Sequence, residues 1–435
     1  MSRELLPLIR VDSKLRAREA AERIRARTEI PPDAVRRAEG IVLGVRERGD
    51  AALLSYSKEL DGVELSEGGL AVGKDEVERA AERVDPGLLG AMRFSLARIR
   101  RTQGRLLGRL PFAYVANGYV VRCVVHPLES VGCYVPGGRA SYASTVLMTA
   151  GVAKLAGVKR VVVCTPPGKD GRVSEAILAA AKISGVDEVY RVGGAQSIAA
   201  LAYGTESIAK VSKIVGPGGA YVSAAKRAVS SDVPIEFVAG PTEMVVVADS
   251  KADPRLVAWD LMGQAEHGGD SICGVVTWDK KLAEKVRETV ATVSTTLERR
   301  DFVQGCLSRG FAAVCKDRDV AIELVNAIAP EHLELMIEDA GKVARSVENA
   351  GLVLAGPYAP AAASDYSIGT DHVLPTGGGA RLRAGLTALD FVKVGWVVEG
   401  SRQGLKALLP SLRELATAEG LPNHFLSAES RFRKE

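Results

Sequence analysis

The chain has 435 residues, and its 57 Lys and Arg nearly balance its 53 Asp and Glu, giving a formal net charge of +4. This balance argues against nucleic acid as a partner, and 47% hydrophobic with 25% charged residues is typical of an ordinary globular protein. No apolar run is long enough to cross a bilayer, and the charged N-terminus lacks the apolar core of a signal peptide. We therefore expect a cytoplasmic protein with a large core, two or more domains and no membrane partner.

The first part of the chain is predicted to be helical. Residues 17–27 are rich in Ala, Glu and Arg, and the pair Pro31 and Pro32 is typical of the start of a second helix. The apolar positions of this second helix recur at helical spacing, which predicts one buried face. They are Val35, Ala38, Val42 and Val45.

From Val120 onward, short β-branched runs alternate with helical segments. The expected strands lie at residues 120–125, 158–164, 188–192 and 213–215, and then at 243–247, 272–276, 311–314 and 352–354. Alternating strands and helices predict parallel sheets with helices on both faces. The expected fold class is α/β, with two Rossmann-like doubly wound parallel-sheet units, a helical N-terminal region and a helical C-terminal tail at 402–417.

The pattern itself indicates two α/β units that follow one another, and the division that we expect has four segments. They are an N-terminal helical arm (1–30), a first α/β domain (31–133 plus 236–385), an inserted α/β domain (134–235) and a C-terminal helical tail (386–435).

The six cysteines contain no CxxC pair. Cys123, Cys133, Cys164 and Cys273 stand in apolar, strand-like surroundings. Both observations argue against a disulfide framework or a thiolate metal site, and predict structural thiols in a reducing compartment.

Glycine clusters are expected just after the strands, at residues 135–138, 192–194, 215–219, 239–241 and 374–379. Glycine there allows the backbone to approach a phosphate closely. None of the clusters is a G-x-G-x-x-G fingerprint, so a standard dinucleotide site is not indicated. A tight turn explains each cluster singly, but several in one unit favour a phosphate-bearing ligand.

Gln264 and His267 are predicted to share one face of the helix before the strand at 272–276, because residues three apart in a helix point to the same side. Amide oxygen and imidazole nitrogen are ligand atoms that zinc and its neighbours accept. Alone, such a pair is more often two exposed side chains on a helix surface that bind no metal. It becomes a candidate metal site when other parts of the chain supply partners.

Glu331 and His332 follow Pro330, a pattern that predicts the opening of a helix whose dipole favours an ionised Glu331. At a helix tip both side chains can reach one cavity. A carboxylate beside an imidazole can move protons near neutral pH. A capping glutamate beside a surface histidine is an equally good interpretation of the dipeptide alone.

Asp365 and His424 are further candidates. Asp365 precedes a glycine-rich loop and could complete a metal shell as an oxygen ligand. His424 is expected on an irregular segment after Gly420, which ends the tail helix. Because chain ends are usually disordered, a functional His424 requires something that anchors the tail. His126 and His372 are expected to be structural rather than ligands.

The chain resembles the histidinol dehydrogenase family over nearly its whole length. The resemblance is carried by many ordered stretches at compatible spacing. They are residues 131–139, 144–148, 192–206, 239–243, 264–267, 329–333, 372–378 and 419–421 together with His424.

The resemblance implies an NAD-dependent, four-electron oxidation of L-histidinol to L-histidine through a bound aldehyde. It implies one Zn²⁺ per subunit held by Gln264, His267, Asp365 and His424, with the 31–133/236–385 domain carrying substrate and zinc and the 134–235 domain carrying NAD. The residues implied to contact substrate are Thr242, Gln264, His267, His332, Asp365, Glu419 and His424.

The resemblance also implies that Glu331 and His332 do the proton work, and that Tyr134 and Gln196 contact NAD. It implies an intertwined homodimer, in which the tail that carries Glu419 and His424 reaches into the partner's site.

This chain departs from the family pattern at Gly219, where an asparagine that contacts NAD is usual. NAD affinity is therefore expected to be weaker or differently arranged. The other departures near the site remove no proposed ligand. They are Thr242, Gly263, Gly269, Ser364 and Asp371.

Two alternatives stay open. A relative with the same metal framework could oxidise another small alcohol, such as sulfopropanediol, but Glu419 is the carboxylate expected to meet the histidinol amine. A metal-bound nucleotide-sensing protein without turnover would not need Glu331 and His332 beside a full ligand set.

Overall fold

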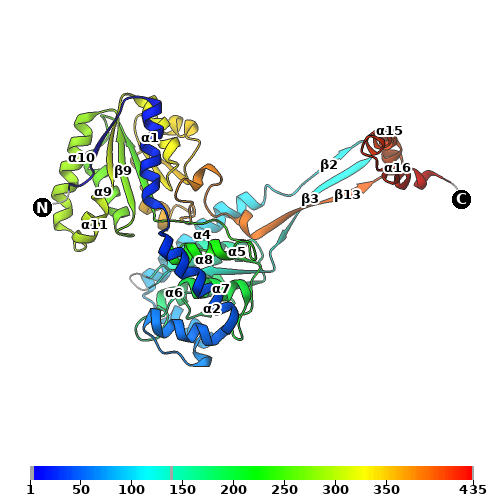
Figure 1. Cartoon of the computed structure of the whole chain (residues 1–435), viewed down its shortest axis with the longest axis horizontal. Coiled ribbons are helices and arrows are strands. Elements are labelled where there is room, and N and C mark those ends of the chain that lie inside the picture. The colour runs from blue at the N-terminus through cyan, green and yellow to red at the C-terminus, as the bar shows by residue number, and fades with distance from the viewer. Residues whose placement is uncertain (1–3, 138–140, 434–435) are drawn as a thin grey trace.

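The computed structural model of the chain describes residues 4–137 and 141–433 (Figure 1). The last two residues of the 131–139 stretch and the end of the 135–138 glycine cluster lie outside this range. Two parallel sheets form the body, which confirms the expected α/β fold class. None of the helices in the described part combines the length and apolarity that a bilayer crossing requires.

The larger sheet has six parallel strands in the order β1-β10-β9-β8-β11-β12. Their bounds are β1 (Leu8–Val11), β8 (Glu243–Ala248), β9 (Ile272–Thr277), β10 (Phe311–Cys315), β11 (His332–Met336) and β12 (Leu352–Ala355). One face is covered by α1 (Lys14–Arg25) and α12 (Arg318–Ile328), and the other by α9 (Pro254–Ala265), α10 (Lys280–Val293) and α11 (Arg300–Leu307). Burial on both faces explains why β8 and β9 are mostly apolar, with Glu243 and Thr277 only at their ends.

The smaller sheet has four parallel strands in the order β6-β5-β4-β7. They are β4 (Ser130–Tyr134), β5 (Arg160–Cys164), β6 (Glu188–Tyr190) and β7 (Lys213–Val215). The chain winds from β4 to β6 and then returns to place β7 on the other side of β4. A reversal of this kind opens a crevice at the carboxyl ends of the two strands on either side of it.

Seven helices in the described residues cover the smaller sheet. On one face lie α3 (Lys74–Arg83), α4 (Pro86–Leu107), α5 (Ala143–Leu155) and α6 (Glu175–Ser184), and on the other lie α2 (Pro32–Tyr56), α7 (Gly194–Tyr203) and α8 (Ala220–Val229).

The packing of α2, α3 and α4 differs from the expected domain division, which grouped residues 31–133 with the larger sheet. The buried stripe of α2, including Ala38 and Val45, packs in the same core as α7 and α8 of the smaller unit. The segment expected as a helical arm instead supplies β1 and α1 to the larger unit. The first strand of the smaller sheet, β4, also begins at Ser130, ahead of the expected boundary at residue 134.

A three-stranded antiparallel sheet projects from the body as an arm (Figure 1). It consists of β2 (Phe112–Ala116), β3 (Tyr119–Pro127) and β13 (Val392–Gly400). Asn117 and Gly118 both have positive φ in the turn between β2 and β3, as a tight hairpin requires. The prediction of a parallel strand at 120–125 was therefore wrong. The tail helix predicted at 402–417 is confirmed by residues 402–418, although β13 precedes it within the 386–435 segment.

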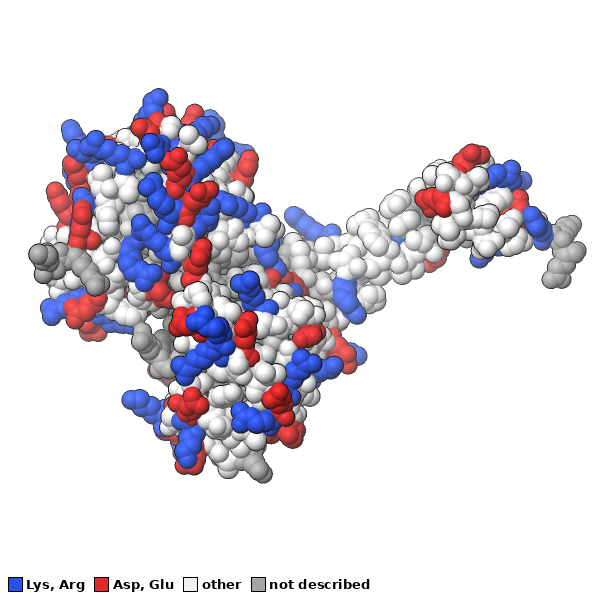
Figure 2. Space-filling view, viewed as in Figure 1, with Lys and Arg blue, Asp and Glu red and all other residues white. Residues whose placement is uncertain are grey.

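The far end of the arm carries α15 (Arg402–Ala418) and α16 (Pro422–Glu429), which pack on each other (Figure 1). On the face seen in Figure 2 the arm is mostly uncharged. Its exposed side chains are largely apolar, with Val115 at 75% and Trp396 at 59% exposure. Large exposed apolar surface of this kind marks a surface that another molecule covers.

All six cysteines are free and buried, as the sequence predicts.

We predict that Gly274→Ala destabilises the larger unit. Gly274 in β9 lies opposite Phe311 in β10, and a Cβ at this position would overlap the buried Phe311 ring. The free energy of unfolding should fall by about 1–3 kcal/mol, because overpacking forces strain on a filled core.

Urea unfolding of the two proteins measures this loss. The matched control is Gly40→Ala in α2, where a Cβ meets open space and stability should rise by about 0.5–1 kcal/mol. Equal stability of Gly274→Ala and the wild type would contradict the described packing of β9 on β10.

Candidate active site

A cavity of about 240 Å³ lies where the two units meet. The smaller unit lines it with Tyr142, Thr145 and residues 217–219, which follow β7. The remaining lining residues that carry chemistry come from the larger unit. They are Thr242, Gln264, His267, Glu331, His332, Asp365 and His372. A larger surface cavity of about 780 Å³ beside α10 contains none of the predicted site residues, so we place the site in the smaller one.

The two sheets present opposite strand ends to this cavity. The loop at 217–219 lies at the carboxyl end of β7, as predicted. In contrast, Thr242 immediately precedes β8, and Glu331 immediately precedes β11. The expectation that every glycine cluster follows a strand was therefore wrong for residues 239–241, which lead into β8.

Glu331 and His332 lie at the amino end of β11, so the prediction of a helix opening was wrong. Ala329 ends α12 in the left-handed conformation, and β11 then pairs with β8 on one side and β12 on the other. Glu331 Oε2 accepts hydrogen bonds from the Glu243 amide at 2.8 Å and from the Thr242 hydroxyl. A strand neighbour, rather than a helix dipole, therefore holds this carboxylate.

The surroundings of Glu331 and His332 raise the pKa of both side chains. Burial raises the pKa of Glu331, although His332 and the Thr242 hydrogen bond oppose this. Burial alone would lower the pKa of His332, but Asp365 and Glu331 outweigh it and raise the pKa to about 9. His332 Nδ1 lies 3.8 Å from Glu331 Oε2, and its Nε2 lies 3.5 Å from Asp365 Oδ1. Such a pair can take up and release a proton within the cavity.

Gln264 and His267 both line the cavity, but the helix predicted to carry both ends at Ala265, so they do not share a helix face. Gln264 is in the last turn of α9, and its Nε2 donates to Thr242 Oγ1 at 2.6 Å. His267 lies just past the helix end, where its amide donates to the Gln264 carbonyl at 3.2 Å. Its Nδ1 faces the same carbonyl at 3.3 Å, which leaves Nε2 for another partner.

Asp365 reaches the cavity from α14 (Ala361–Tyr366) and is 7% exposed. Burial opposes its ionisation, but His332, His372 and His267 outweigh burial and lower its pKa. A carboxylate kept ionised among imidazoles is a suitable oxygen donor for a divalent cation.

The donors fit a metal that accepts nitrogen and oxygen, but a single chain offers only part of a shell. Gln264, His267 and Asp365 supply an amide, an imidazole and a carboxylate to one cavity. Across residues 4–137 and 141–433, no group of three or more His, Cys, Asp or Glu side chains is placed to hold a metal.

Glu419 and His424 lie at the far end of the arm, away from the cavity of the same chain (Figure 1). Gly420, with φ of 70°, ends the α15 region as predicted. His424 is in the first turn of α16 and exposed, so the expectation of an irregular segment was wrong. Pro422 at the start of α16 supplies the helix signal that the prediction missed.

Tyr134 and Gln196 lie in the smaller unit and are 5% and 1% exposed. The Tyr134 hydroxyl accepts from the Gly194 amide at 3.4 Å. Gln196 Nε2 lies 3.5 Å from a carboxylate oxygen of Asp61, while its Oε1 is buried without a partner. The prediction did not find Asp61, whose pKa burial raises to about 6.

The contacts of His372 were also not foreseen. Its Nε2 lies 3.1 Å from Thr145 Oγ1, and its Nδ1 lies 3.1 Å from the Asp365 carbonyl. His372 thus joins α5 of the smaller unit to the helix that carries Asp365. The 144–148 and 372–378 stretches were the available signal, but only the fold brings them together.

Comparisons with known proteins agree over nearly the whole chain. The family profile described as histidinol dehydrogenase matches residues 25–432. The histidinol dehydrogenase of Moorella thermoacetica is 42% identical over 430 residues, which cover 98% of this chain and 100% of that protein. That of Methanosarcina mazei is 41% identical over 393 residues, or 90% of each. The crystal structure of histidinol dehydrogenase from Elizabethkingia anophelis is 31% identical, with a TM-score of 0.90 over 98% of each chain.

A buried carboxylate–imidazole pair in a cavity between two parallel α/β units defines a two-domain α/β enzyme that can exchange protons with a bound substrate. The match over residues 25–432 then makes the enzyme an oxidoreductase. The chain belongs to the histidinol dehydrogenase family.

We predict that Glu243 makes folding stability depend on pH. This residue is 4% exposed, its Oε1 accepts from the Gly377 amide at 2.8 Å, and burial raises its pKa to about 8. Between the ordinary pKa of a glutamate and this value, the unfolded chain is ionised while the folded chain keeps its proton. The contribution of Glu243 to stability is therefore fully present at low pH and is lost as the pH rises.

Glu243→Gln should remove this dependence, so its stability relative to the wild type should rise by roughly 2 kcal/mol between about pH 5 and about pH 7. Urea unfolding at both pH values measures the difference, with exposed Glu39→Gln in α2 as the control. A difference between Glu243→Gln and wild type that does not change with pH would show that Glu243 is ionised in the folded protein.

Proposed function

We propose that this enzyme carries out the four-electron oxidation of L-histidinol to L-histidine through L-histidinaldehyde, with NAD as the electron acceptor and one Zn²⁺ per subunit. The observation that supports it is the buried Glu331–His332 pair beside three candidate ligands in one cavity. The names of the relatives support the choice of substrate. The reaction belongs to the last steps of histidine biosynthesis.

Gln264, His267 and Asp365 of one subunit would hold the zinc together with His424 of the tail from a second subunit. When bound, the ion supplies positive charge that orients the imidazole and amine of the substrate. The nitrogen and oxygen donors of this set suit zinc. Thr242 and Glu419 would contact the substrate, the latter as the carboxylate that meets its amine.

The two oxidations need different proton steps. In its neutral form, His332 accepts the hydroxyl proton while hydride leaves the alcohol carbon for NAD. Water must then add to the aldehyde to give a diol: Glu331 accepts the proton of that water, and His332 returns its proton to the aldehyde oxygen. The diol loses a second hydride to a second NAD while His332 accepts a hydroxyl proton, which yields the carboxylic acid. The raised pKa of Glu331 suits it to this proton transfer.

NAD would bind at the smaller unit, where the reversal of strand order puts the loop at 217–219 beside the cavity. Gly219 has open space where a side chain would project, so the missing asparagine leaves room there. Tyr134 and Gln196 remain proposed NAD contacts. Because both are buried, they would need to move to touch the cofactor.

The arm supports an intertwined homodimer. The strands of the arm expose apolar side chains. In addition, α16, which carries His424, lies at the far end of the arm and away from the cavity of the same chain (Figure 1). On the body, Leu256 and Trp259 expose apolar surface on α9, the helix that carries Gln264. We propose that the arm and tail of one subunit cover such surface on the other and complete its site.

The yield of NADH tests the function directly. The zinc-loaded enzyme should form roughly two molecules of NADH for each histidinol consumed, since NAD accepts one hydride at a time. A yield of one would limit the enzyme to alcohol oxidation. Inert histidinol, with turnover of another small alcohol such as sulfopropanediol, would favour a related dehydrogenase.

We predict that Glu331→Gln separates the two half-reactions. A glutamine cannot accept the proton of water, so oxidation of histidinaldehyde should fall by about 10²–10⁴-fold. Oxidation of histidinol in a single turnover should be affected much less. Stopped-flow NADH formation from each substrate measures both rates, and equal losses would contradict the separate roles.

We also predict that subunit mixing restores activity. His424→Ala and His332→Ala proteins should each be inactive alone. After random reassociation about a quarter of the sites are intact, because half of the dimers are mixed and each has one complete site. Mixing His267→Ala with His332→Ala is the matched control and should restore nothing, since both residues come from the same body. No recovery with His424→Ala would mean that the tail does not act in trans.

A further inference from the structure

Gly216 occupies a constrained position at the start of the loop formed by residues 216–219, here called the Gly216 loop. Its φ is 122°, and a Cβ would overlap the carbonyl oxygen of Tyr134 at the end of β4. Only glycine fits there, so the peptide direction at this point is fixed by β4. The next residues, 217–219, line the cavity. Any change in the direction of Gly216 therefore moves the cavity wall.

A buried ion pair holds Gly216 by both of its backbone polar groups. Glu236 Oε1 accepts from the Gly216 amide at 2.7 Å, and Lys226 Nζ donates to the Gly216 carbonyl at 3.0 Å. Lys226 Nζ also donates to Glu236 Oε1 at 2.6 Å. The two side chains are 2% and 0% exposed. These hydrogen bonds connect the Gly216 loop to Lys226 in α8 and to Glu236.

Burying two opposite charges has a large desolvation cost, so this pair contributes little net stability to the fold. Burial lowers the pKa of Lys226, and Glu236 only partly compensates for it. Apolar side chains of similar volume often serve stability equally well at buried ion pairs. The function of the pair is therefore better sought in the Gly216 backbone groups that it binds.

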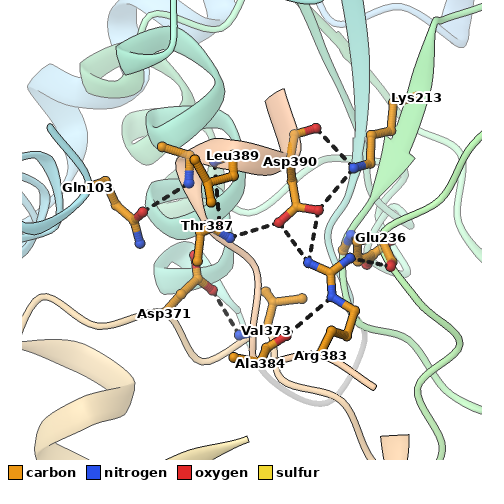
Figure 3. A network of polar contacts seen from close by, with 12 residues as sticks. Gln103, Lys213, Glu236, Asp371, Val373, Arg383, Ala384, Thr387, Leu389 and Asp390 are labelled. Carbon is orange, nitrogen blue, oxygen red and sulfur yellow. Dashed lines mark hydrogen bonds and ion pairs between the residues drawn. The ribbon is translucent and has the colours of Figure 1, made fainter. Parts of the chain in front are cut away.

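Further charges fix the other side of the pair (Figure 3). Arg383 donates to the Glu236 carbonyl at 2.6 Å and to both carboxylate oxygens of Asp390. Asp390 also accepts from Lys213 at the start of β7. Phe237 lies between the Lys226 and Arg383 cations. The network spans β7, the 236–242 segment and the root of the arm just before β13.

We propose that Lys226 and Glu236 are positioning residues that hold the Gly216 loop in the shape that accepts NAD. The inference rests on the proposed function, because it assigns this wall of the cavity to the cofactor. Neither side chain reaches the cavity itself. Both act through the peptide of Gly216, so their removal should weaken cofactor binding and leave the zinc and histidinol groups in place.

The decisive variant is the double substitution K226M/E236M, which replaces the pair by apolar side chains of similar length. Its melting temperature should stay near that of the wild type, while the dissociation constant of NADH, from fluorescence titration, should rise by about tenfold, or about 1.4 kcal/mol. KM for NAD should rise in parallel. KM for histidinol and zinc content should not change. Glu236→Gln retains an oxygen that can accept from Gly216 and should keep affinity close to wild type.

The control is K182M/E78M, an exposed pair that links α6 and α3 of the same unit away from the cavity. It should change neither NADH affinity nor turnover. Wild-type NADH affinity in folded K226M/E236M would overturn the positioning role. So would an unfolded K226M/E236M protein, because the pair would then be a requirement of folding.

Failure of the proposed function gives a different result. Wild-type enzyme that binds NADH but does not oxidise histidinol would reject that function and leave the NADH titrations to decide on Lys226 and Glu236. Wild-type enzyme that oxidises histidinol, with no change of affinity in the double variant, would reject only the positioning role.

Discussion

The structure depends on a buried row of polar groups that joins β8, β11 and α14. Thr242 and the Glu243 amide hold Glu331, Glu331 lies beside His332, and His332 faces Asp365. A buried charge is costly unless hydrogen bonds or an opposite charge compensate for it, so no member of this row can be removed without cost to its neighbours. The same compensation perturbs the pKa values of the row. Its chemistry and its stability thus share one origin.

The two units contribute different kinds of group because they meet through opposite strand ends. The smaller sheet presents carboxyl ends, where residues 217–219 of the Gly216 loop line the cavity. The larger sheet presents amino ends, where β8 and β11 begin and the Glu243 amide is available to a carboxylate. Backbone groups thus suit one side of the cavity to a phosphate-bearing cofactor. Titratable side chains suit the other side to proton transfer.

The sequence was sufficient to predict the elements that local patterns define. Alternating strands and helices predict both parallel sheets, and apolar surroundings predict the buried cysteines. Non-local pairing was beyond such patterns. Residues 120–125 pair in an antiparallel arm with β13, which lies far along the chain, and the stripe of α2 packs on α7 and α8. Pro330 imitates a helix start, but the two strands flanking β11 override that local signal.

In the candidate site, too, the sequence predicts the chemistry of individual side chains but not their contacts with residues far along the chain. The side chains of Gln264, His267 and Asp365 converge on one cavity, as their chemistry suggests, although no spacing in the sequence could place Thr145 near them. The proposal that depends most on a second subunit is that His424 of its tail completes the zinc site. Crystals of the zinc-loaded protein, measured at the zinc absorption edge, test it most directly. We predict one anomalous peak per chain, contacted by His267 and Asp365 of one subunit and by His424 of its partner. A peak elsewhere, or one completed without His424 of the partner, would contradict it.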